Sequence, residues 1–258
     1  MNPYDLQLAE YGYDLDLEGT TVVPVLKFGS RPDVGTTFAT VAQLGGSELH
    51  ETYATTNAIS HVVSSSASDT DQTLTVYGHT IAAGVLTGIE QTVDLNGQTK
   101  VALGTALGRI ERAYVSSGSA LVGDVYVFED GAVTGGVPDT DSDVHAVIPA
   151  ADNQTLKAAL SVADGEWMLV SRLSGSINKR SAGYAELKLQ KRDASAGGGP
   201  WRTQYTFTVA SQGSSTGSVD VEPWMPVGPN NDLRIVAEAD GGSTPVSAQI
   251  HGLRFREA

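Results

Sequence analysis

Apolar and polar residues alternate along several stretches of the chain, and the clearest is residues 201–209. One set of alternate positions holds Trp201, Thr203, Tyr205, Phe207 and Val209. The positions between them are polar. A period of two residues is that of a β-strand with one buried face and one face in water. Residues 185–190 alternate in the same way, so we expect antiparallel strands rather than helices.

Eight candidate strands lie between residue 144 and the end of the chain. They are residues 144–148, 155–162, 166–173, 183–191, 201–209, 218–224, 232–238 and 246–256. Eight short strands separated by turn-rich segments fit a jelly-roll-like β-sandwich.

A hairpin is expected in the middle of the chain. Ile89, Val93 and Leu95 share one face of a strand, and an alternating run resumes at Lys100. The dipeptide Asn96-Gly97 separates the two runs. Both of its residues tolerate a positive φ, which favours a type I′ turn between paired strands.

The N-terminal residues cannot close a core of their own. Acidic residues alternate there with tyrosine and leucine, and Val22–Phe28 reads as one strand. Pro24 lacks an N–H, so this strand is expected at a sheet edge or not at all. The best helical stretches are short, at residues 3–10 and 39–50.

These patterns divide the chain into four parts. We predict an extended N-terminal arm (1–60) that lies on its own domains or on a neighbouring subunit. A small β-domain (61–135) and a polar linker (136–143) follow it, and a C-terminal β-sandwich (144–258) completes the chain.

Composition supports an all-β fold and excludes several classes of protein. The chain has 29 glycines and no cysteine, so disulfides, thiolate zinc sites and a cysteine nucleophile are excluded. No stretch approaches the roughly 20 apolar residues of a membrane helix, so no membrane association is expected. No basic segment followed by an apolar one indicates a secretion signal.

The charge is acidic and unevenly distributed. The formal net charge is −14, from 16 basic and 30 acidic residues, which disfavours nucleic acid as a partner. Residues 1–60 hold 8 acidic and 2 basic residues, residues 61–144 hold 11 and 3, and residues 145–258 hold 11 of each. The acidic excess is therefore expected to face solvent or a basic host surface, and the neutral part to pack with copies or partners.

One short motif matches a hydrolase pattern. Residues 213–217 read Gly-Ser-Ser-Thr-Gly, which fits G-x-S-x-G. A nucleophile elbow needs a strand before it and a helix after it, whereas this segment lies between two expected strands. We interpret it as a turn.

Metal-binding patterns are equally weak. Asp139, Asp141 and Asp143 alternate, but the sixth and twelfth positions of an EF-hand loop starting at Asp139 are Val144 and Ala150. A solvated linker is favoured there over a weak cation site. The five histidines form no H-x-x-x-H pair; they are His50, His61, His79, His145 and His251. We expect no catalytic, cofactor-binding or metal-binding residues.

Aromatic residues supply the candidate contact sites. Trp201 and Tyr205 share a strand face with apolar residues and are expected in the core. Trp224 is flanked by prolines at an apparent edge, which favours an exposed anchor for a partner protein. The candidate interface residues are Tyr11, Tyr13, Leu15, Phe28, Trp224 and Met225.

Part of the chain resembles known phage modules. Leu74–Gly78, Glu90–Leu103 and Gly123–Val127 resemble a small immunoglobulin-like β-domain of tailed-bacteriophage virion proteins. The stretch from Ile148 to Phe255 is similar to a second phage module, a jelly-roll-like sandwich. The shared features are turns and strands, without a catalytic signature.

This resemblance implies a virion structural protein of the capsid decoration or cement type, without catalytic residues or cofactors. It implies a major capsid protein as partner, a place on the capsid surface, and a homo-oligomer, with a trimer favoured. The absence of cysteine suits assembly in the reducing cytoplasm of the host.

Other functions stay open. A tail or head-fibre module would bind a host receptor or carbohydrate, and its glycan binding would be lost in Trp224→Ala. A head–tail connector component would differ in copy number and location. A jelly-roll enzyme would need paired carboxylates or a histidine cluster in a groove, which the sequence does not indicate.

Overall fold

The computed structural model describes residues 15–17, 20–42, 56–179, 181–194, 199–212, 216–241 and 243–257. Within these ranges there is no α-helix, and the one helical turn is the 3-10 segment η1 (Asp141–Asp143). Every pair of neighbouring strands is antiparallel. The predicted all-β sandwich fold is confirmed.

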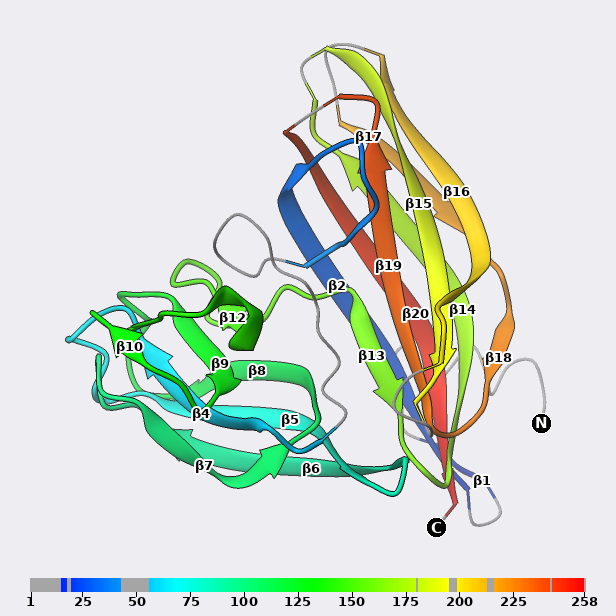
Figure 1. Ribbon diagram of the computed structural model, residues 1–258. Helices are drawn as coiled ribbons and strands as arrows, with labels where there is room; N and C mark the ends of the chain where they lie inside the picture. Colours follow the sequence, from blue (N-terminus) through cyan, green and yellow to red (C-terminus); the bar gives the residue numbers. More distant parts are fainter. Residues whose placement is uncertain are drawn as a thin grey trace. The chain divides into compact units, whose positions relative to one another are not determined.

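The strands form two compact units (Figure 1). The terminal unit combines Met1–Val41 with Ala158–Ala258, and the central unit is Ala42–Lys157. This division differs from the predicted one, because strand patterns show where strands lie but not which strands pair.

Two sheets make up the terminal unit. The first has the order β1-β2-β20-β14-β17, with β18 also paired to β14. Its strands are β1 (Leu15–Leu17), β2 (Thr20–Val34), β14 (Glu166–Ile177), β17 (Gly217–Val221), β18 (Met225–Val227) and β20 (Thr244–Glu257). The second has the order β13-β19-β15-β16, with β3 paired to β19. Its strands are β3 (Ala39–Thr40), β13 (Ala159–Val162), β15 (Ala182–Asp193), β16 (Arg202–Gln212) and β19 (Asn231–Ala239).

The N-terminal segment is part of the first sheet, not an arm lying on it. β2 pairs with β20 along nearly its whole length, so two strands far apart in the sequence lie side by side (Figure 1). Val22 and Val34 are fully buried, and Val34 belongs to the core between the sheets. Beyond Val22, β2 has no second neighbour among the described strands. The edge position expected from Pro24 is therefore confirmed.

One core lies between the two sheets of the terminal unit. Leu187 and Val209 from the second sheet pack with Leu173 and Ile250 from the first. The predicted alternation of β16 is confirmed at its C-terminal half. It fails near its start, where a bulge between Leu189 and Gln190 shifts the register and leaves Thr203 exposed.

The central unit also has two main sheets. One has the order β12-β9-β4-β7 and the other β6-β5-β8. The strands are β4 (Ile59–Ser64), β5 (Thr73–Ala82), β6 (Val85–Asp94), β7 (Val101–Leu107), β8 (Arg109–Ser117), β9 (Val125–Glu129) and β12 (Val144–Ile148), and β10 (Val133–Thr134) pairs with β11 (Val137–Pro138). Side chains from both main sheets share one core, and a smaller cluster around Phe128 covers the opposite face of β9.

The predicted linker lies inside the central unit. Residues 136–143 contain β11 and η1, and the strand that follows, β12, pairs with β9. The strand predicted at 144–148 is therefore present, but it belongs to the central unit and not to the C-terminal sandwich. Glycine and aspartate mark a loop within a domain as well as a linker between domains, which explains the misplaced boundary.

The type I′ hairpin turn predicted at Asn96-Gly97 is wrong: a turn begins at Asn96, but Asn96 is not at positive φ and the turn does not close a hairpin. The Thr99 N–H donates to the Asn96 carbonyl, whereas the flanking strands β6 and β7 belong to different sheets. Gly97 has a positive φ, and a Cβ there would lie 2.9 Å from the Ala67 carbonyl oxygen. Glycine is needed for this close approach to a neighbouring loop.

Of the two predicted helices, the structure tests only the start of the second, and there it shows a strand. Ala39–Thr40 form β3, while residues 3–10 and 43–50 lie outside the described ranges.

Candidate functional site

The outer face of the first sheet of the terminal unit carries aligned polar side chains. The ladder register places in one row, from β2 to β17, Ser30, Ser247, Ser176 and Ser218. The next row holds Phe28, Gln249, Ser174 and Asp220. The third row holds Leu26, His251 and Arg172.

Polar residues of β14, β17 and β20 in these rows line a shallow groove of about 340 Å³. Arg172 and Asp220 are its charged residues. The other lining residues are serines, a glycine, Gln249 and His251. The groove is therefore polar and carries one formal positive and one formal negative charge.

Hydrogen bonds hold one side of the groove in place. The Arg172 guanidinium lies 3.2 Å from His251 Nδ1, and because a guanidinium only donates, that nitrogen accepts. The other ring nitrogen, Nε2, then donates to Gln249 Oε1 at 3.0 Å. The Arg172 Nε is buried and has no hydrogen-bond partner within the described part of the chain.

The same sheet face is apolar towards the other end of β14. Trp167 pairs with Phe255, and Leu169 pairs with Leu253. We call this end the apolar patch and define it by Pro24, Leu26, Trp167, Leu169 and Phe255. Leu26 is 59% exposed and Trp167 is 54% exposed.

The structure places four of the six predicted interface residues in the terminal unit. Trp224 is 48% exposed and has a φ of +46°, and Phe28 is half-buried in β2 beside the groove. Met225 packs partly against the core. Leu15 lies in β1, although its side chain is outside the description.

Tyr11 and Tyr13 lie outside the described residues. The interface residues predicted from the sequence did not include Leu26 or Trp167. Leu26 has the same parity as Phe28 in β2, so the alternation of that strand was the signal that could have found it.

Trp201 differs from its predicted place in the core. It is half-buried, with the guanidinium of Arg234 at 4.0 Å and that of Arg192 at 4.8 Å from its ring. Lys188 makes a similar contact with Phe38, at 3.6 Å. These cation–π contacts stabilise the second sheet of the terminal unit.

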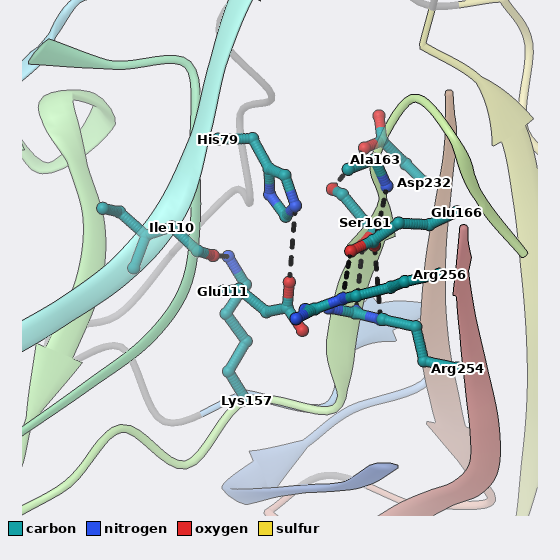
Figure 2. Close-up of polar contacts among 10 residues, drawn as sticks. All are labelled: His79, Ile110, Glu111, Lys157, Ser161, Ala163, Glu166, Asp232, Arg254 and Arg256. Carbon is teal, nitrogen blue, oxygen red and sulfur yellow. Dashed lines mark hydrogen bonds and ion pairs between the residues drawn. The ribbon is translucent and has the colours of Figure 1, made fainter. Parts of the chain in front are cut away.

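Figure 2 shows an ionic cluster of the terminal unit, in which Arg254 and Arg256 point towards Glu166; Arg254 and Glu166 are buried and Arg256 is partly exposed. The Arg256 Nε donates to Glu166 Oε1 at 2.6 Å, and the Arg254 Nε lies 3.5 Å from Oε2. The Ala163 N–H also donates to Oε2. With both oxygens engaged, Glu166 serves as an ion-pair anchor between β14 and β20.

A second buried carboxylate belongs to the same unit. Asp232 is fully buried, accepts a hydrogen bond from the Ser161 hydroxyl at 2.6 Å (Figure 2), and pairs with Arg192 at 3.0 Å. These contacts join β13, β15 and β19. The arrangement is that of a structural ion pair, in which each charge is compensated.

Buried polar residues of the central unit are also drawn in Figure 2. His79 Nε2 lies 3.7 Å from Glu111 Oε2, and the Lys157 ammonium donates to the Ile110 carbonyl at 3.1 Å. His79 comes from β5 and Glu111 from β8, which are neighbours in one sheet. The pair therefore links two strands.

The metal patterns weighed in the sequence do not assemble into a site. Among the residues that the structure describes, no three histidine or carboxylate side chains are grouped closely enough to hold a metal ion. His145 instead contacts Glu129 at 2.9 Å, and His61 lies 3.7 Å from Asp130. His50 lies outside the description.

The G-x-S-x-G segment connects β16 to β17, two strands. Its first three residues, 213–215, are not described, and Gly217 begins β17. A strand, not a helix, follows the motif, which supports the interpretation as a turn. The described residues contain no helix with the length and hydrophobicity that a membrane span requires.

Comparison with known proteins gives no family. No family model matches the chain, and no curated protein matches it. Among solved structures it is similar to an isomalto-dextranase of Arthrobacter globiformis T6 complexed with panose, at 10% identity and a TM-score of 0.23 over 92% of this chain. The chain spans about a third of that enzyme, 35% of its length.

Two further similarities are to virus- and phage-associated proteins. The PBSX exported protein XepA is 13% identical, with 90% of this chain and 86% of that chain covered and a TM-score of 0.18. The VP2 subviral particle of infectious bursal disease virus is 10% identical, with 98% of this chain and 81% of that chain covered and a TM-score of 0.15. With TM-scores this low, these similarities carry no argument about function.

Proposed function

We propose that this chain is a virion structural protein that decorates or cements a bacteriophage capsid by binding its major capsid protein. The observation that supports this best is the apolar patch, where Leu26 and Trp167 are more than half exposed. A few large apolar or aromatic anchors supply most of the binding energy in protein contacts. The resemblance of the sequence to phage modules supplies the class of partner.

The geometry of the patch suits a flat protein surface. Register places Leu26 beside His251 and Trp167 beside Phe255, so the two anchors flank β20 on opposite sides and are offset by about 13 Å along it. Both project from strands, which fixes their spacing. Many copies of one modest contact around a symmetric shell give a stable attachment by avidity.

Self-association is part of the proposal. β16 is paired with β15 on one side only among the described strands. No proline or charged residue occurs in it between Thr203 and Gln212, so it lacks the usual protection of an exposed edge. We propose that this edge contacts a neighbouring copy within a homo-oligomer, with a trimer favoured. Thr206→Lys should shift the sedimentation velocity of the chain towards that of a monomer, and a wild-type monomer at all concentrations contradicts this part.

The proposal assigns the chain no enzymatic activity. Its support is that Glu166 and Asp232 are held by arginines or hydroxyl groups, an arrangement that stabilises charge and leaves neither as a general base. A net charge of −14 argues against nucleic acid as a partner.

Binding to particles that lack the chain tests the function. Purified wild-type chain should co-sediment with such particles, and Leu26→Asp combined with Trp167→Ala should lower the bound copies at least tenfold by quantitative mass spectrometry, a loss of about 1.4 kcal/mol or more. Val122→Asp is the matched control, because Val122 is 66% exposed in the central unit. Normal binding of the double variant contradicts the patch as the contact.

Location separates the decoration role from the alternatives. Cryo-electron microscopy of the virion should show copies that follow the capsid lattice. Copies confined to the portal vertex or to fibres would identify a connector component or a receptor-binding module instead. Absence of the chain from purified particles contradicts the virion role.

A further inference from the structure

We propose that the polar groove on β14, β17 and β20 binds a neutral carbohydrate. This inference concerns a different part of the sheet face from the apolar patch, and it does not rest on the proposed function. It differs from a platform built around Trp224, because the groove residues are Arg172, Ser174, Ser176, Asp220, Gln249 and His251.

Charge balance selects the class of ligand. Arg172 and Asp220 are the two charged residues of the groove, and they come from adjacent strands. An anionic ligand would be attracted by the Arg172 guanidinium but repelled by the Asp220 carboxylate. A cationic ligand would be attracted by Asp220 and repelled by Arg172. A neutral ligand that both donates and accepts hydrogen bonds satisfies both groups.

The hydrogen-bonding groups match a polyol. Asp220 is exposed, and beyond the backbone ladder no side-chain hydrogen bond or ion pair joins it, Ser174 or Ser176 to another described residue. A carboxylate accepts two hydrogen bonds from neighbouring hydroxyls, a guanidinium donates to ring and hydroxyl oxygens, and serine does both. Arg172 lines the groove, and its guanidinium carries further N–H donors besides the one that meets His251.

The strand ladder and one side-chain contact hold the polar residues of the groove at fixed positions. Ser174 and Ser176 alternate along β14 and pair with Asp220 and Ser218 of β17, so their spacing is fixed by the ladder. Serine and aspartate side chains have few rotamers to lose on binding. The contact of Arg172 with His251 holds the longer side chain in place.

An aromatic residue flanks the polar groups. Phe28 of β2 pairs with Gln249 and projects from the same sheet face, half-buried. The C–H face of a sugar ring packs on such a ring while its hydroxyls reach the polar residues. Ligand sites commonly combine an apolar wall with a few placed polar groups.

A microarray of neutral and acidic glycans, probed with the full chain, tests the proposal. Binding to neutral glycans is expected, and isothermal titration with the best neutral glycan should then show one site. Asp220→Asn and Arg172→Lys should each weaken that binding about tenfold, because each change removes or displaces a charge-assisted hydrogen bond to the ligand. Asp33→Asn removes an exposed charge elsewhere in the same sheet and should leave binding unchanged.

Three results overturn the proposal. They are no neutral glycan bound on the array, binding restricted to acidic glycans, and binding of a neutral glycan that neither groove variant weakens. The groove variants should fold normally, as judged by tryptophan fluorescence, since both positions tolerate the isosteric or similar side chain. They should also still bind capsid particles, which keeps failure of this inference distinct from failure of the virion role.

Discussion

The two units are both antiparallel sandwiches, yet they are assembled from the chain in opposite ways. The central unit is a continuous segment, Ala42–Lys157, whereas the terminal unit needs both ends of the chain. Its first sheet depends on β2 pairing with β20, a contact between residues at opposite ends of the sequence. Such a contact costs more loop entropy to form and slows folding. The pairing of β2 with β20 also shows that strands distant in the sequence share a sheet in this chain.

The units also differ in charge. The central unit has 14 acidic and 4 basic residues, and the terminal unit has 16 and 12. Both the apolar patch and the neutral groove lie on the terminal unit. The acidic central unit is suited to solvation, and both proposed contact sites belong to the less charged terminal unit.

Removing β2 should have the largest effect. We expect deletion of Met1–Val41 to unfold the terminal unit, because Val22 and Val34 leave their buried sites and β20 loses a neighbour along its length. All three tryptophans belong to this unit, at positions 167, 201 and 224, so tryptophan fluorescence reports it alone. Hydrogen exchange in residues 59–148 should remain slow. An unchanged tryptophan unfolding transition would restore the interpretation of this segment as a separate arm.

A buried carboxylate should matter most in the central unit. Asp69 is fully buried and accepts hydrogen bonds from the Ser64 hydroxyl at 2.5 Å and from the N–H groups of Val122 and Gly123 at 2.8 and 3.0 Å. We expect Asp69→Ala to lower the free energy of unfolding by about 3 kcal/mol, because these donors lose their acceptor. Hydrogen-exchange mass spectrometry of the central unit measures this.

The neighbouring Asp71 provides the control. It accepts from Ser119 at the surface, so Asp71→Ala should destabilise the central unit much less than Asp69→Ala. Equal losses for both variants would contradict the role of Asp69, and a shifted tryptophan transition in Asp69→Ala would show that the units do not unfold separately.

Most strand positions could be predicted from the sequence, because apolar and polar residues alternate in any strand that buries one face. β16 and β15 are examples, with Phe207 and Leu187 inside. Which strands pair with each other could be predicted less well. The β2 pattern gave a strand with an edge proline, but no local signal identified β20 as its partner.

Turn chemistry explains a second difference. The central hairpin that has both turn residues at positive φ joins β5 and β6 through Ala83 and Gly84, at 51° and 82°. Alanine is uncommon there, so the sequence signal pointed instead to Asn96-Gly97, which turns the chain from one sheet to the other. The groove was missed because its residues come from three strands that only register aligns.

A glycine in the terminal core gives the next test. A Cβ on Gly175 of β14 would lie 2.8 Å from the Phe207 ring and 3.1 Å from Leu187. We expect Gly175→Ala to destabilise the terminal unit by about 1–3 kcal/mol through overpacking. Urea unfolding followed by tryptophan fluorescence measures it, with Phe207→Leu restoring part of the loss in the double variant. Gly35→Ala, with nothing within 4 Å, is the control and should change little.

Of the changes considered, acidification should produce the smallest difference in stability between the two units. The Ser119 hydroxyl lowers the pKa of Asp71, and the ammonium groups of Lys100 and Lys179 lower the pKa values of Asp130 and Asp240. A lowered pKa means that the unfolded chain binds more protons, so this stabilisation is complete above the ordinary aspartate pKa of about 3.9 and is lost as pH falls through the folded values. Unfolding midpoints should therefore stay level from about pH 7 to 5 on this account and decline below about pH 4.

Two of these carboxylates, Asp71 and Asp130, are in the central unit and one, Asp240, is in the terminal unit, so the central unit should lose more on acidification. All three are at the surface, and protonation also relieves the repulsion among the central acidic residues, so the difference should be small. Salt separates the causes: it screens the Lys100 and Lys179 pairs but not the hydroxyl bond to Asp71. In molar salt, the loss of stability caused by acid should therefore decrease more in the terminal unit, because its only carboxylate of this set is paired with a lysine. An equal decrease in both units would contradict these assignments.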